Sequence, residues 1–160
     1  FHEPWNRKAV LAVILIAAMG FFLEVIGVAT GKVFGTYSYS QLLGWKVLDV
    51  PLIIALNWLI LVYGAYYIAS MLVKHPLLRL LIGGILLVGF DLVMEPVAIE
   101  LNMWSWQAEI PPVQNYLVWF VAGIAMMSMF PVLRIRMKNH VAMALFIYTF
   151  LFFTILNFVL

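Results

Sequence analysis

The chain has 160 residues, of which 66% are hydrophobic and only 10% are charged. Its mean hydropathy of +1.09 lies far above that of ordinary soluble domains and indicates an integral membrane protein. The net charge of +2 is too small to indicate a nucleic-acid partner. The absence of cysteine excludes disulfides, thiol nucleophiles and cysteine-based metal sites.

Five segments are long and apolar enough to cross a bilayer, which takes about 20 mainly apolar residues. They cover residues 9–29, 51–73, 77–98, 113–133 and 141–160. No internal repeat or linker is visible, so we predict an all-α, polytopic transmembrane helix bundle in which residues 1–160 form a single integral membrane domain. Because the chain starts with Phe1 instead of Met, five spanning helices are a minimum.

The connection between the first and second spans has an unusual composition. Residues 30–50 mix Gly, Tyr and Ser with apolar residues and carry little charge. Non-helical backbone at membrane depth is tolerated only where it is buried in protein or lines a cavity. We therefore predict either a re-entrant segment that folds back into the bundle or an interfacial amphipathic segment. Asp49, just before Val50-Pro51, is predicted to cap the second span.

The positive charges predict the orientation, because Lys and Arg are retained on the cytoplasmic side of a membrane. Lys32 and Lys46 fall on one side of the predicted bundle, whereas the other side holds Arg7, Lys8, Lys74, Arg79, Arg134, Arg136 and Lys138. We therefore predict a cytoplasmic amino end. His75 and His140 then lie in solvated inner connections, and His2 belongs to the exposed terminus.

Three acidic residues interrupt the apolar spans. Asp91 and Glu95 lie four residues apart in the third span, and Glu24 lies in the first. The helical rise places all three in one layer, roughly 5–10 Å below the outer ends of their helices. Ionisable groups in hydrocarbon are costly and mark functional sites, and two neighbouring carboxyl groups tend to share a proton. The pair predicts one general acid and one base, although a structural hydrogen-bonded pair is the alternative.

Further polar and aromatic residues fall near the same layer. Aromatic rings offer electron-rich faces to a cation, and amides hold water or link helices. Packing or interfacial roles remain the alternative for each of them. No metal site is predicted, because no His lies in this layer and no Asp-rich diphosphate-binding repeat occurs. The candidate substrate-binding residues are Tyr37, Tyr39, Asn57, Trp106, Asn115, Tyr116 and Trp119.

Four ordered motifs between Glu24 and Phe120 resemble the membrane carotenoid hydratases, which include the bisanhydrobacterioruberin and γ-carotene hydratases. The motifs are Glu24-x-x-Gly27-x-x-Thr30-Gly31-x-x-Phe34-Gly35-x-Tyr37-x-Tyr39, Val50-Pro51-Leu52 with Asn57-Trp58, Asp91-x-x-Met94-Glu95-Pro96-x-Ala98 with Trp104-x-Trp106, and Pro112-x-x-Asn115-Tyr116-x-x-Trp119-Phe120.

The resemblance implies the addition of water to a terminal double bond of a long polyene, which gives a tertiary alcohol through a carbocation without a cofactor. Carried onto this chain, it makes Glu95 the proton donor, Asp91 its partner and water-orienting base, and Glu24 a third acid. The implied partners are a carotenoid or isoprenoid lipid substrate, membrane lipid and a possible second copy of the chain.

Other functions also fit the residues. The first step of hydration, followed by attack of a neighbouring alkene, gives the ring closure that the related membrane lycopene cyclases perform; an isomerase would share that step too. From other classes, a proton-coupled transporter also places carboxylates inside a bundle, and a noncatalytic carotenoid-binding subunit would need the aromatic residues but not the acids. Gain of the mass of water by the product distinguishes hydration from cyclisation.

Overall fold

The computed structural model describes residues 7–135 and 139–160 of the chain. Five helices in this part of the chain are long and apolar enough to cross a membrane, which confirms the predicted helical bundle. They are α1 (Arg7–Thr30), α2 (Ile53–Leu72), α3 (Pro76–Glu100), α4 with its short continuation α5 (Val113–Met127 and Met129–Val132), and α6 (His140–Val159).

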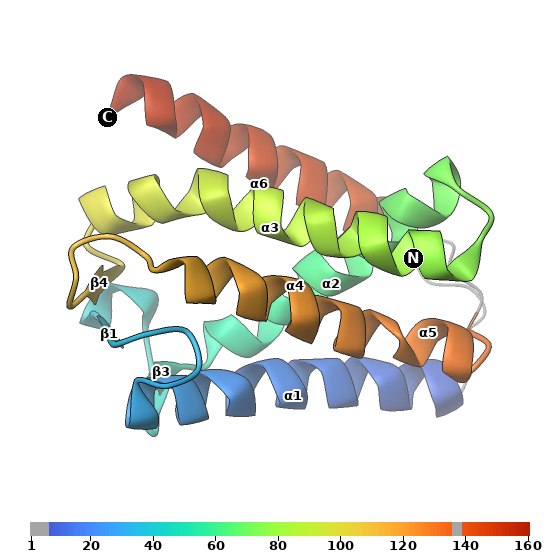
Figure 1. Ribbon diagram of the computed structural model, residues 1–160, viewed down its shortest axis with the longest axis horizontal. Helices are drawn as coiled ribbons and strands as arrows, with labels where there is room; N and C mark the ends of the chain where they lie inside the picture. Colours follow the sequence, from blue (N-terminus) through green and yellow to red (C-terminus); the bar gives the residue numbers. More distant parts are fainter. Residues whose placement is uncertain (1–6, 136–138) are drawn as a thin grey trace.

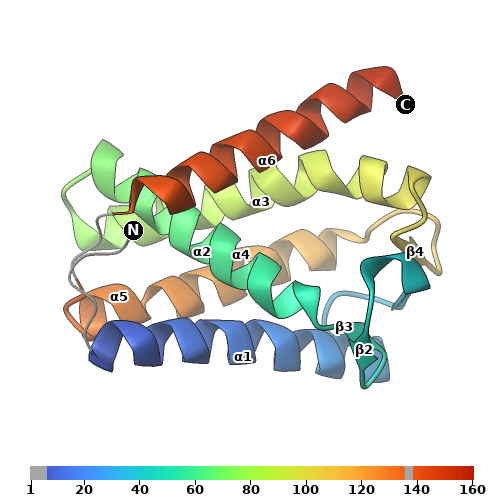
Figure 2. The same ribbon diagram turned by 180° about the vertical axis from the view of Figure 1, so that it is seen from behind.

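Helix α2 lies at the centre of the bundle, where it packs against α1, α3 and α6. Helix α3 joins the two halves of the molecule because it packs against α2, α4 and α6 (Figures 1 and 2). Helix α1 packs against α2 and the short strand β3 (Val50–Pro51), while α4 packs mainly against α3. The two outer helices α1 and α4 therefore run beside each other without a tight interface between them (Figure 1).

Glycine lets these helices approach closely, as is usual where apolar helices pack in lipid. A Cβ atom at Gly20 of α1 would lie 2.5 Å from Trp58 of α2, and one at Gly123 of α4 would lie 2.3 Å from Leu87 of α3. Large aromatic and aliphatic side chains thus sit directly against the backbone of the neighbouring helix. The remaining surface is apolar, with Phe22, Leu117 and Val121 among the exposed side chains.

Two segments distant in the sequence form a small antiparallel ribbon across one end of the bundle. Strand β1 (Tyr37–Tyr39) follows α1, strand β4 (Trp104–Trp106) follows α3, and Tyr37 stands opposite Trp106 in the register. This ribbon end, as we call it, is where α1 and α3 finish and where α2 and α4 begin (Figure 1). The connection after α1 does fold back onto the bundle, since Phe34 and Tyr37 are buried.

The prediction that Asp49 caps the second span is wrong. Strands β2 (Lys46–Val47) and β3 (Val50–Pro51) pair as a hairpin, and Leu48 and Asp49 form its two-residue turn with φ values of 52° and 64°. Two left-handed residues are what a tight hairpin turn needs, because their twist matches that of the strands. A short 3₁₀ turn (Gln41–Leu43) precedes the hairpin, and α2 starts two residues after it without a side-chain cap.

The predicted spans otherwise agree with the helices to within a few residues. The fourth span is interrupted at Ser128, between α4 and α5. Pro131 explains the interruption, because it lacks the N–H that would bond to the carbonyl of Met127. His75 and His140 are exposed at the end opposite the ribbon. Of the charges used to predict orientation, Arg136 and Lys138 lie outside the described residues, as does His2.

Candidate active site

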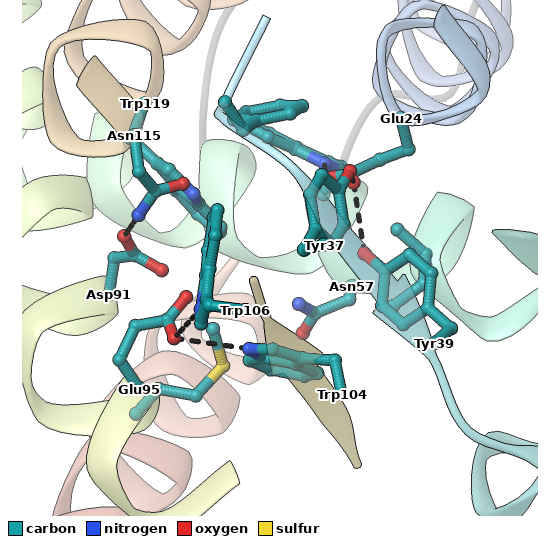
Figure 3. Close-up of a pocket in the computed structure, with 14 residues that line it drawn as sticks. Glu24, Tyr37, Tyr39, Asn57, Asp91, Glu95, Trp104, Trp106, Asn115 and Trp119 are labelled. Atoms are coloured by element: carbon teal, nitrogen blue, oxygen red, sulfur yellow. Dashed lines mark hydrogen bonds between the residues drawn. The ribbon is translucent and has the colours of Figure 1, made fainter. Parts of the chain in front are cut away.

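A small cavity lies under the ribbon, between the ends of α1, α2, α3 and α4 (Figure 3). Its free volume is about 30 Å³, which accommodates a water molecule but no larger group. All of the predicted site residues except Tyr116 line it. The lining residues are Glu24, Phe34, Tyr37, Tyr39, Ile54, Asn57, Trp58, Asp91, Met94, Glu95, Trp104, Trp106, Asn115 and Trp119.

Glu24 is only 4% exposed, and three side chains donate hydrogen bonds to it. Trp58 Nε1 donates to Oε1 at 2.9 Å, Tyr39 donates to Oε2 at 2.9 Å, and Tyr37 donates to the same oxygen. Gly20 and Gly27 lie about one turn away on the same face of α1. Because neither has a side chain, Trp58 and Tyr37 can approach the helix beside the carboxyl group.

The two tyrosines remain neutral hydrogen-bond donors. Burial raises the pKa of both the Tyr37 and the Tyr39 hydroxyl above its ordinary value, and the neighbouring Glu24 carboxylate raises both further. They reach the same carboxyl group because alternate residues of a strand point to the same face.

Glu95 is also 4% exposed and is held by the opposite strand of the ribbon. Trp106 Nε1 donates to Oε2 at 2.8 Å and Trp104 Nε1 donates to the same oxygen at 3.1 Å. In the register of the ribbon, Tyr37 is paired with Trp106 and Tyr39 with Trp104. One face of the ribbon therefore supplies four aromatic donors, with the tyrosines bound to Glu24 and the tryptophans to Glu95 (Figure 3).

Asp91 differs from the two glutamates because one of its oxygens has no partner. The side chain is fully buried, and Asn115 Nδ2 of α4 donates to Oδ2 at 2.6 Å. Oδ1 is the one buried side-chain oxygen or nitrogen in the described residues without a hydrogen bond. An unsatisfied buried polar atom typically costs about 1–3 kcal/mol, so this atom at the wall of a cavity calls for an explanation.

Asp91 and Glu95 lie on one face of α3, as their spacing predicts, but they do not hydrogen-bond to each other among the described contacts. Each carboxyl group is held by a different neighbour, Asp91 by α4 and Glu95 by the ribbon. The alternative of a structural hydrogen-bonded pair that links helices would therefore act through these contacts and not through a bond between the two carboxyl groups. Within the described residues, no group of three His, Cys, Asp or Glu side chains is placed to hold a metal ion.

Aromatic rings form much of the remaining wall. Trp58 of α2 stacks on Trp119 of α4 with ring centres 4.3 Å apart, and Tyr37 lies 4.9 Å from Trp106. Asn57 also faces the cavity from α2 (Figure 3). The result is a small cavity with three carboxyl groups and a largely aromatic wall, which suits chemistry that passes through a cation.

Tyr116 lies elsewhere, on a surface groove between α3 and α4. Asn115 and Trp119 are four residues apart, on the face of α4 that lines the cavity. Tyr116 lies on the adjoining face of the same helix, which lines the groove. The set of predicted site residues did not include Phe34, Ile54, Trp58, Met94 and Trp104. Trp58 and Trp104 belong to the motifs of the sequence resemblance, and that signal pointed to them. Phe34 and Met94 also belong to these motifs, whereas Ile54 has no feature that separates it from ordinary core residues.

Comparison with known proteins identifies the family of the chain. The sequence model of the family described as "Carotenoid biosynthesis protein" matches residues 3–160. The chain is 31% identical over 135 residues to the bisanhydrobacterioruberin hydratase of Haloarcula japonica, a match that covers 78% of this chain and 45% of that protein. The chain thus spans about half the length of this relative. No solved structure matches the chain significantly. With a family match over nearly its whole length, the chain belongs to the carotenoid biosynthesis protein family.

Proposed function

We propose that this protein hydrates a terminal carbon–carbon double bond of an acyclic carotenoid, giving a tertiary alcohol. Family membership and the hydratase relative support a carotenoid substrate. The cavity supports acid–base chemistry on an alkene, because it combines three carboxyl groups, aromatic walls and room for a water molecule. Water is the only reactant that this addition needs besides the alkene.

The observation that carries the proposal is the unpartnered Oδ1 atom of Asp91. A carboxylic acid at this position avoids burying a charge, and its O–H is free to reach a substrate. The indole N–H groups beside Glu95 can only donate, so Glu95 acts as an acceptor there. We therefore assign Asp91 as the proton donor. This reverses the sequence-based assignment, in which Glu95 is the donor and Asp91 its partner.

The proposed reaction proceeds in three steps. The electron pair of the double bond takes the proton from Asp91 Oδ1, which forms a C–H bond at the less substituted carbon and leaves a tertiary carbocation. The oxygen of a cavity water then forms the C–O bond. The resulting oxonium loses a proton to Glu95, and this proton returns to Asp91, so that the net change is the addition of one water molecule.

Charge and aromaticity in the cavity support the cationic intermediate. Glu24 accepts three hydrogen bonds, which favour its carboxylate form, and it lies across the cavity from Asp91 (Figure 3). The aromatic rings of Trp58, Trp119 and Trp106 line the same space, so that a cation there can meet their electron-rich faces. A cation held against such faces gains about 2 kcal/mol or more per contact when water is excluded.

The test is expression in a host that accumulates lycopene, with pigments analysed by mass. Wild-type protein should convert the pigment to a product that is heavier by one or two molecules of water. Asp91→Asn keeps the shape and the contact with Asn115 but cannot donate a strong acid proton, and it should abolish conversion. Glu100→Gln, an exposed glutamate at the end of the same helix, is the matched control and should behave as wild type.

Two results would contradict the proposal. If wild-type protein yields a product of unchanged mass, the cyclisation or isomerisation alternative replaces hydration. If Asp91→Asn converts the substrate at the wild-type rate, the acid assigned here does not act.

A further inference from the structure

A second hollow lies on the membrane-facing surface between α1 and α4. This α1/α4 groove has a free volume of about 510 Å³, far more than the acidic cavity, and it is open along one side. Its lining contains no charged residue. The residues are Met19, Phe22, Leu23, Ile26, Val33, Val118, Val121, Ala122, Ala125 and Met126.

The groove exists because α1 and α4 pack against different partners, α2 and α3. At the ribbon end the gap is closed by Gln114 of α4, whose side-chain amide donates to the backbone carbonyls of Lys32 and Val33. Below this contact the groove follows the helices for about 12 Å, the rise of some eight helical residues. It therefore opens sideways, toward lipid, and is shut toward the membrane surface.

The groove and the acidic cavity share a thin wall. On α1, Leu23 lines the groove and the next residue, Glu24, lines the cavity. On α4, Val118 lines the groove and Trp119 lines the cavity. In the loop after α1, Val33 faces the groove and Phe34 faces the cavity. At three places, therefore, two consecutive residues line the groove and the cavity respectively.

A competing groove between α3 and α4 borders the cavity in the same way, because Leu92, Tyr116 and Phe120 of this groove directly follow Asp91, Asn115 and Trp119 of the cavity. The two grooves differ in size and in how tightly their helices pack. The α3/α4 groove has a free volume of about 380 Å³ and includes Gly89, Tyr116 and Phe120. Behind it the two helices interlock tightly, since a Cβ atom at Gly84 would lie 2.8 Å from the Phe120 ring. A molecule in that groove would have to part α3 from α4 to reach Asp91.

Access to the cavity requires movement, because its volume of about 30 Å³ holds water but no hydrocarbon end group. Phe34 is the part of the wall that is carried by a loop instead of a helix. The loop has a glycine with positive φ at each end, Gly31 at 64° and Gly35 at 116°. Such backbone positions allow a hinge at little steric cost.

We infer that the α1/α4 groove binds the linear chain of the polyene and that its terminal double bond enters the acidic cavity past Phe34. The inference rests on the proposed function for the identity of the chain. It makes the enzyme selective for long, acyclic substrates that approach from within the bilayer, because the entrance faces lipid and is bounded by apolar side chains.

The test compares two substitutions that each place one aromatic ring in a groove. Ala125→Phe fills the α1/α4 groove, with Val121→Trp as a second variant on the same surface. Gly89→Phe is the matched control in the α3/α4 groove, where an added Cβ meets nothing within 4 Å. Two quantities are measured for each well-folded purified protein. The first is the amount of lycopene retained per protein, and the second is the rate at which lycopene is converted, compared with the rate for a short acyclic alkene that has the same end group.

We expect the α1/α4 variants to lower lycopene retention and conversion about tenfold, equivalent to about 1.4 kcal/mol of binding free energy. The short alkene should be converted as by wild type, and Gly89→Phe should change nothing. Normal lycopene retention by both α1/α4 variants would overturn the inference and leave an ordinary lipid chain as the occupant, and so would a loss confined to Gly89→Phe.

The proposed function can fail separately. Wild-type protein that retains lycopene in a groove-dependent manner but converts neither substrate would refute hydration and still support the groove. Conversion that is insensitive to both α1/α4 variants would support hydration and refute the groove.

Discussion

At the scale of single residues, the three buried carboxyl groups are stabilised in different ways. Glu24 has donors on both oxygens, Glu95 has two donors on one oxygen, and Asp91 keeps one oxygen without a partner. A sequence shows that acids lie at membrane depth but not which donors reach them. Their presence in one layer was therefore predictable, whereas the proposed division of roles between Asp91 and Glu95 depends on contacts made by Asn115 and the ribbon.

The indole N–H of Trp106 can be tested by Trp106→Phe, which keeps an aromatic ring and removes the donor. Glu95 loses the shorter of its two hydrogen bonds, and a bond to a charged group contributes about 1.5–3 kcal/mol. Since Glu95 accepts the proton in the proposed reaction, we expect turnover to fall by about tenfold or more. Trp45→Phe, at a side chain that is 86% exposed, should leave turnover unchanged. A Trp106→Phe enzyme with the wild-type pigment yield and initial rate would contradict this role.

The tyrosine pair on Glu24 predicts a difference in stability. Tyr39→Phe removes a donor at 2.9 Å and should lower the free energy of unfolding by about 1.5–3 kcal/mol. Tyr148→Phe on the exposed surface of α6 is the control and should have little effect, because its side chain is 71% exposed. Thermal midpoints measured in the same detergent would reveal the difference, and equal midpoints for the two variants would count against the Glu24 network.

At the scale of elements, the ribbon and the helix packing position the site together. The ribbon joins segments 65 or more residues apart, which is why no local pattern indicated it. Its three-residue strands are too short for a sequence signal, and they form because the helix ends hold them side by side. The spacing of Asp91 and Glu95 on one helical face was, by contrast, a local property and was predicted correctly.

Close packing of α1 on α2 can be tested by Gly20→Ala. The added methyl group would lie 2.5 Å from the Trp58 side chain, and such overpacking typically costs about 1–3 kcal/mol. Because Trp58 also donates to Glu24, the displaced ring should weaken both the fold and the conversion of substrate. Gly89→Ala is the matched control on α3, where nothing lies within 4 Å of the new methyl group. Thermal midpoint and pigment conversion would be measured for both; a fully wild-type Gly20→Ala would show that the interface is looser than described.

At the scale of the whole molecule, the acids and the ribbon gather at one end and the basic connections at the other. Lys74, Arg79 and Arg134 lie at the end opposite the ribbon, whereas Lys32 and Lys46 lie beside it. The distribution of charge favours a cytoplasmic amino end and an acidic site in the outer half of the membrane. This orientation remains a prediction.

The absence of cysteine from the chain makes the orientation directly measurable. Single cysteines would be introduced by Leu42→Cys at the ribbon end, where the side chain is 70% exposed, and by His75→Cys at the opposite end. A membrane-impermeant maleimide should label Leu42→Cys in intact cells and His75→Cys only after permeabilisation. The reverse pattern would place the acidic site on the cytoplasmic side.

The sequence was sufficient to predict those features that depend on local composition and on the periodicity of the helix. The hydrophobic spans, the layer of acids and the helical face shared by Asp91 and Glu95 all follow from chain-local rules. The tertiary structure alone decided that four ribbon aromatics divide between Glu24 and Glu95, that Asp91 Oδ1 stays unpartnered, and that Tyr116 faces away. The reason is physical: hydrogen-bond partners and cavity walls come from segments distant in the chain, and only their packing determines which side chains meet.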